Sequence, residues 1–106
     1  MKRNFSTELK GLQNARLEDE KGVAFTLGNV AVNALLGQYQ DEQVGGDEKF
    51  KRFKLADRIS VGGVQEVSAE EIALIKRLVG KGFLPMFVGA VYDALEQDIT
   101  AEPAAS

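Results

Sequence analysis

The chain has 106 residues, of which 44% are hydrophobic and 27% are charged, and its net charge is −3 at pH 7. It contains no cysteine and no histidine, which excludes disulfides, Ser-His or Cys-His nucleophiles and histidine-ligated zinc sites. The acidic balance disfavours a general affinity for phosphate backbones.

This length predicts one compact domain, over residues 1–98, followed by a flexible tail over residues 99–106. No apolar run approaches the roughly 20 residues that a bilayer requires, so we expect no association with a membrane. The start of the chain, residues 1–8, lacks the apolar core of a signal peptide. These features together favour a cytoplasmic protein.

The first 25 residues are predicted to form a small antiparallel β-hairpin. Phe5, Thr7 and Leu9 alternate with polar side chains, and a second alternating run ends at Phe25. The polar stretch over residues 13–22 would connect the two strands.

A first helix is predicted from Thr26 to about Gly37. Thr26 and Asn29 stand at the two positions of a capping box, although Asn29 is a poorer partner there than a glutamate. Apolar residues recur along one face at helical spacing, namely Leu27, Val30, Ala31, Ala34 and Leu35.

A second helix is predicted from Asp47 to Ile59, after a polar linker that ends in two glycines. Aromatic and aliphatic residues recur every third position, and we expect the rings of Phe50 and Phe53 to face the core. The cations of this helix are expected on its opposite, solvated side, at Lys51, Lys54 and Arg58.

A third helix is predicted to begin after Ser68, which is preceded by a β-branched run that predicts a short second β element. Ser68 and Glu71 form the pattern of a capping box, and Val67 and Ile72 are placed to form the hydrophobic staple around it. The glycines of the Gly80-Lys81-Gly82 triplet are expected to end the helix.

A fourth helix is predicted from Leu84-Pro85 to about Gln97, since proline suits the first helical turn. It is apolar over a broad arc, which we expect to form the centre of the core. The alternative is that part of the arc packs against another copy of the chain or another partner. The candidate contact residues are then Phe87, Val88, Val91, Tyr92 and Leu95.

No motif in the chain carries recognisable chemistry. Glu70 and Glu71 are explained by helix capping and the helix dipole, and the triplet around Lys81 lacks the spacing of a phosphate loop. We therefore assign no catalytic residue, metal ligand or cofactor and expect a protein that is not an enzyme. A nucleic-acid-binding regulator that uses Lys51, Lys54 and Arg58 remains the alternative.

Three segments together resemble a group of small, mostly uncharacterised proteins of tailed bacteriophages and prophages. They comprise residues 26–36, beginning Thr-Leu-Gly, residues 48–56, and the stretch that runs from Ser68 to Tyr92. The resemblance covers roughly residues 5–96 and has no catalytic motif to transfer. It implies a protein of the bacterial host cell with a role in assembly or interaction.

These observations combine into one prediction of an α+β domain. A small N-terminal antiparallel hairpin is followed by about four helices, with a short second β element between them. The predicted function is non-enzymatic assembly or protein–protein interaction through an apolar helix face. The partner on that face could be a second copy of the chain, which would form a homodimer.

Overall fold

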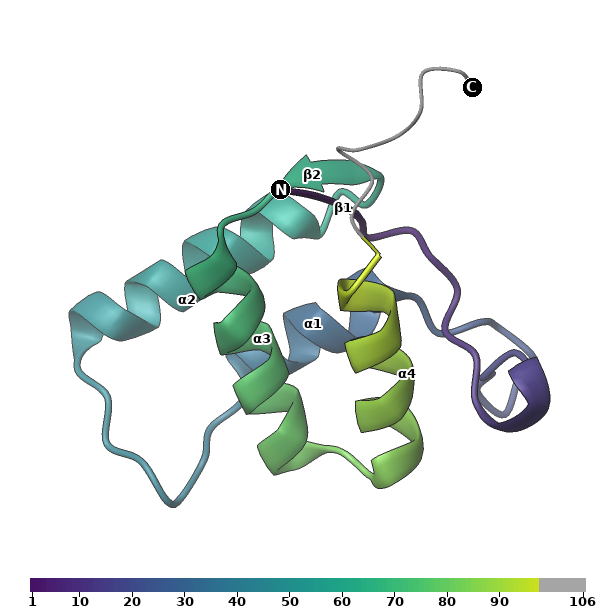
Figure 1. The fold of residues 1–106 in the computed structure, drawn as a ribbon. Coiled ribbons are helices and arrows are strands. Elements are labelled where there is room, and N and C mark those ends of the chain that lie inside the picture. Colours follow the sequence, from purple (N-terminus) through teal and green to yellow (C-terminus); the bar gives the residue numbers. More distant parts are fainter. Residues whose placement is uncertain (98–106) are drawn as a thin grey trace.

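The computed structural model describes residues 1–97 and shows an α+β domain, as predicted (Figure 1). The predicted tail over 99–106, with residue 98, lies outside the described residues. The elements in chain order are β1 (Lys2–Asn4), the 3₁₀ turn η1 (Leu12–Asn14), α1 (Leu27–Leu36), α2 (Gly46–Ile59), β2 (Val64–Glu66), α3 (Ala69–Gly82) and α4 (Pro85–Leu95).

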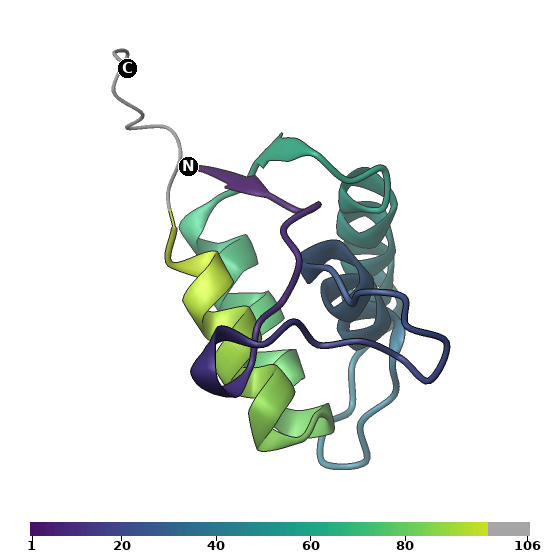
Figure 2. The same ribbon diagram turned by 90° about the vertical axis from the view of Figure 1, so that its right-hand side faces the viewer.

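Helix α1 is the centre of the helical part of the molecule. It contacts each of the other three helices, while α3 and α4 pack against each other as an antiparallel pair. The small sheet lies at one end of the helices, above α3 and α4 in Figure 2. No helix of residues 1–97 is both long and apolar enough to cross a membrane.

The two predicted capping boxes are both present and set the starts of α1 and α3. The hydroxyl of Thr26 accepts a hydrogen bond from the backbone N–H of Asn29 at 3.2 Å, and the Asn29 side chain accepts one from the Thr26 N–H. Ser68 and Glu71 make the equivalent pair at 3.1 and 2.9 Å. The observed helix starts therefore agree with the predicted ones to one residue.

The two-stranded antiparallel sheet joins the N-terminal strand to the predicted second β element. Lys2 is paired with Glu66 and Asn4 with Val64 in the β1–β2 ladder. Within the first part of the chain, antiparallel pairing takes the form of isolated bridges, such as the one between Glu8 and Thr26. The 3₁₀ turn η1 lies between the paired residues Lys10 and Arg16 of another such bridge.

The buried face of α2 differs from the prediction. Phe50 and Phe53, which we expected in the core, are 61% and 53% exposed. The face that packs inward carries Leu55, Ala56 and Ile59, together with the charged residue Arg52, which is only 4% exposed. The prediction was wrong for the two phenylalanines because a buried arginine interrupts the apolar stripe that would have revealed the true face.

The buried apolar residues form one continuous core. Phe5 and Leu9 of the N-terminal segment fill it from one side, against the buried faces of all four helices. Its largest fully buried side chains also include Leu27, Val30, Ile59, Val67, Ile75, Leu78, Val79, Val91 and Leu95.

Candidate functional site

Arg52 sits at the centre of a cluster of charges between α2, α3 and the connection from α1 to α2. Its Nη1 lies 2.7 Å from Oε1 of Glu42, and its Nε lies 3.1 Å from Oε2 of Glu48. Arg77 of α3 also reaches Glu42, at 3.2 Å, and Lys81 does so at 3.6 Å. Glu42 therefore receives three cations from two helices.

This concentration of positive charge controls the ionisation of Glu42. The hydrogen bonds from Arg52 and then from Arg77 lower the pKa of Glu42 from 4.5 to about 2, against an opposing effect of burial. In return, the hydrogen bond to Glu42 raises the pKa of Arg52. Both groups are charged at neutral pH and are matched to each other, which is the arrangement of a structural ion pair.

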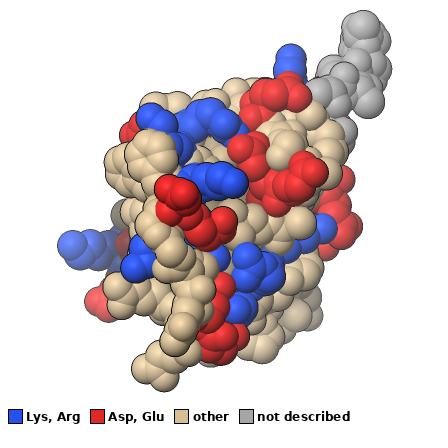
Figure 3. Space-filling view, turned by 90° about the vertical axis from the view of Figure 1, so that its left-hand side faces the viewer, with Lys and Arg blue, Asp and Glu red and all other residues tan. Residues whose placement is uncertain are grey.

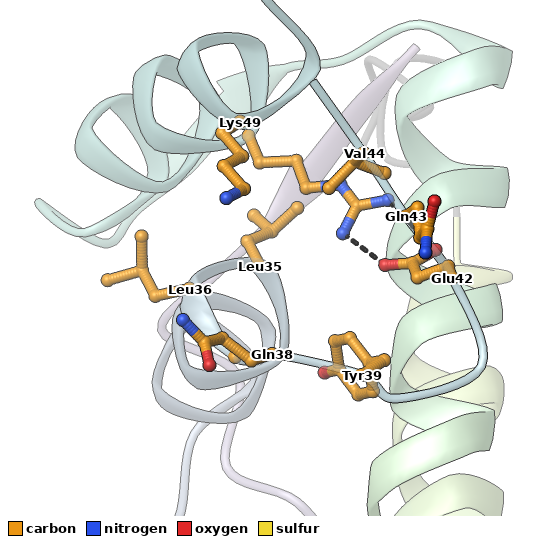
Figure 4. Close-up of a pocket in the computed structure, with 10 residues that line it drawn as sticks. Leu35, Leu36, Gln38, Tyr39, Glu42, Gln43, Val44 and Lys49 are labelled. Carbon is orange, nitrogen blue, oxygen red and sulfur yellow. Dashed lines mark hydrogen bonds and ion pairs between the residues drawn. The ribbon is translucent and has the colours of Figure 1, made fainter. Parts of the chain in front are cut away.

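A hollow of about 530 Å³ lies beside this cluster, and Figure 4 shows its walls. Tyr39 closes one side, and its hydroxyl donates a hydrogen bond to the carbonyl of Ala34 at 2.7 Å. Lys49 of α2 and Leu36 at the end of α1 also line the hollow. The polar groups at its base are engaged with each other, so the cluster fastens the α1–α2 connection rather than presenting reactive groups.

The predicted partner residues of α4 lie in or against the core. Val91 and Leu95 are fully buried and offer no surface to a partner. Phe87 is half-buried, with its ring 5.0 Å from that of Phe25 in an edge-to-face contact. Val88 is also half-buried against the core. The broad apolar arc of α4 is therefore mainly the core helix face, which was the interpretation that the sequence favoured.

Tyr92, the last of these candidates, is held by α3. Its hydroxyl donates a hydrogen bond to the carbonyl of Lys76 at 3.0 Å, and the Lys76 ammonium lies 5.4 Å from the centre of its ring. These contacts join α3 to α4 within the chain. A partner could reach the buried residues of this α4 face only if the core opened.

The outer face of α2 is an exposed apolar surface, and we define it by Phe50, Phe53, Lys51, Lys54 and Arg58. Both phenylalanine rings are exposed for more than half of their area, and they lie about one helical turn apart. The three candidate cations from the sequence lie on the same helix, with the ammonium of Lys54 5.9 Å from the centre of the Phe50 ring. The aromatic rings and the cations are thus together in solvent.

An open groove of about 480 Å³ runs between this face and α3, and we call it the α2–α3 groove. Leu55 and Leu74 form its apolar base, and Phe50 forms one wall. Lys51, Lys54 and Glu48 line it from α2, and Glu70 and Glu71 line it from α3. Sequence periodicity does not reveal the groove, because neither helix alone indicates which residues face each other across it.

The charges on this side of the molecule do not form a single-sign surface. Figure 3 shows Lys and Arg interspersed with Asp and Glu and with uncharged side chains. Arg58 is already paired with Glu71, at 2.8 Å. Among residues 1–97, no cluster of three acidic side chains could hold a metal ion. Comparison with known protein families, curated proteins and solved structures finds no match.

Proposed function

We propose that this protein is a non-enzymatic assembly or interaction protein that docks another polypeptide on the outer face of α2. The observation that carries the proposal is the exposure of Phe50 and Phe53 on one helix face. Buried aromatic anchors supply much of the binding energy in protein interfaces, and adjacent exposed rings are typical of such sites rather than of an unpartnered surface. Docking on α2 takes the place of docking on α4.

A phage or prophage origin is part of this proposal. It is supported by the resemblance of the three segments described above, which include all of α1 and most of α2. Neighbouring genes on the chromosome test it directly. Head and tail genes beside this one would support a role in assembly, whereas a locus without any phage gene would contradict the phage origin.

The docking face is tested by affinity purification from cells that carry the native locus. We expect the wild-type chain to retain a stoichiometric polypeptide partner, either another protein or another copy of itself. The double variant Phe50→Ser/Phe53→Ser should lose it. Leu12→Ser is the control, because Leu12 is also an exposed apolar residue, at 74%, but lies in η1 and not on α2. Equal retention by both variants would contradict docking on α2.

The second candidate function is nucleic-acid binding, and the exposed rings are the observation that favours it. Proteins that hold single strands stack bases on aromatic rings beside cations, and Phe50 and Phe53 lie beside Lys51 and Lys54. The interspersed acidic side chains and the net charge of −3 oppose it. Fluorescence anisotropy with labelled single-stranded DNA and RNA at low salt separates the two functions. Binding that weakens with salt and with Lys51→Glu/Lys54→Glu would favour the nucleic-acid function.

A further inference from the structure

We infer that the polypeptide seated on the α2–α3 groove is a second copy of this chain, related to the first by a two-fold axis along the groove. This inference rests on the proposed function, since the groove shares Phe50, Lys51 and Lys54 with the outer face of α2. Two observations support it. The first is the position of the charged side chains around the groove, and the second is that several of them are unpaired within the described part of the single chain.

The charges that are not paired among the residues that the structure describes have opposite sign on the two sides of the groove. Lys51 and Lys54 stand on the α2 side together with Glu48, which is paired with Arg52. Glu70 stands on the α3 side beside Glu71, which is paired with Arg58. The base between them is apolar, formed by Leu55 and Leu74. The groove is therefore a strip of apolar surface with a basic edge and an acidic edge.

Such a strip is complementary to its own two-fold image. A rotation of 180° about an axis that runs along the strip turns one copy to face the other, and it places the basic edge of each opposite the acidic edge of its partner. In an isologous interface each such contact occurs twice. A partner of one charge sign would instead be repelled by one of the two edges.

The charges that this pairing needs are available. Within residues 1–97, Lys51, Lys54 and Glu70 make no hydrogen bond or ion pair through their side chains, and the ammonium of Lys54 lies over the ring of Phe50. Glu71, by contrast, is engaged by Ser68 and Arg58. Phe50, exposed at the wall of the groove, is placed to cover the apolar base of the opposite copy.

Charge exchange between two variants tests the arrangement. Lys51→Glu/Lys54→Glu makes both edges of the groove acidic, and Glu70→Lys makes the acidic edge basic. Each variant alone should repel its own copy and raise the dimer dissociation constant by about tenfold or more. A mixture of the two should recover a dimer of near wild-type affinity, because both contacts of the mixed pair again join opposite charges.

The measurement is sedimentation velocity over a concentration series of the purified full chain, with one variant carrying a fluorescent label in the mixture. Lys21→Glu, a charge reversal in the exposed turn after Asp19, is the control and should dimerise like the wild type. Recovery in the mixture also demonstrates that both variants are folded.

The outcomes separate this inference from the proposed function. A wild-type chain that stays monomeric at every concentration, or a mixture that does not recover, overturns the second copy as partner. If the affinity purification then still retains a different protein through Phe50 and Phe53, the proposed docking face stands. If neither a second copy nor another protein depends on these rings, both proposals are wrong.

Discussion

A buried arginine replaces an apolar residue in the layer between α2 and the α1–α2 connection. Arg52 occupies a position that helical periodicity reserves for the core, and its charge is tolerated there because Glu42 and Glu48 accept its hydrogen bonds. Sequence periodicity does not reveal such a residue, because the acid that neutralises it lies ten positions away in a polar linker. For this reason Phe50 and Phe53 were predicted to be buried, whereas they are exposed.

Replacing Arg52 with methionine should destabilise the protein by roughly 2–3 kcal/mol, because the hydrogen bonds to two carboxylates are lost and Glu42 loses its main partner. The measurement is urea unfolding followed by circular dichroism. Arg16→Met is the control, since Arg16 pairs with Glu18 at an exposed site where an ion pair contributes little. An equal loss of stability in the two variants would show that the Arg52 cluster does not stabilise the fold more than an exposed ion pair does.

Glu42 should make the stability depend on pH in the acid range. Its folded-state pKa of about 2 lies below the usual 4.5, so its ionised form stabilises the native state. That contribution is complete above about pH 5 and is lost as the pH falls toward 2. Urea unfolding between pH 7 and pH 2 should show that Glu42→Gln is less stable than wild type above pH 5 and that the difference shrinks in acid. A difference that stays constant with pH would contradict this assignment.

At the scale of elements, local signals account for where the helices begin. The capping boxes of α1 and α3 each join a side chain to a backbone N–H three residues away. Pro85 occupies the first turn of α4, as predicted. These interactions depend only on neighbouring residues, so they can be predicted without knowledge of the fold. The last residue of α3 is Gly82, within the glycine triplet that was expected to end the helix.

Substitution of alanine for two helical glycines should change the stability of the protein in opposite directions. A Cβ at Gly28 of α1 would lie 2.9 Å from the backbone oxygen of Phe5, whereas a Cβ at Gly89 of α4 would meet no atom within 4 Å. Gly28→Ala should therefore destabilise by about 1–3 kcal/mol through overpacking. Gly89→Ala should stabilise by about 0.5–1 kcal/mol through helix propensity.

Thermal unfolding of the two variants checks this pair. Both substitutions add the same methyl group to a helix, so each is the control for the other. A rise in melting temperature for Gly28→Ala would show that the N-terminal segment does not approach α1 as closely as the structure indicates.

At the scale of the whole molecule, the N-terminal segment is part of the core. Phe5 is almost fully buried against the helices, and its backbone accepts a hydrogen bond from the N–H of Gly28 at 2.8 Å. The β1–β2 ladder then ties the same segment to the chain before α3. The sheet and the helices therefore share one core, and we expect them to unfold in a single transition.

Truncation of two phenylalanines to alanine should show which of them belongs to that core. Phe5→Ala should cost about 3–5 kcal/mol, while Phe50→Ala should change the stability of the monomer by no more than about 0.5 kcal/mol. Urea unfolding is measured at a protein concentration low enough to suppress self-association, because a dimer would add its own stability. A large loss of stability in Phe50→Ala under these conditions would show that the Phe50 ring is part of the core.

The sequence by itself determined the fold class, the four helices and the starts of α1 and α3. Those features follow from caps, prolines and periodic apolar residues, which act over a few positions along the chain. Only the tertiary structure decided that β1 pairs with β2 and that Phe50 and Phe53 remain in solvent while Arg52 is buried. Contacts between distant segments decide these points, since the burial of a residue depends on which charges and surfaces the rest of the fold brings to it.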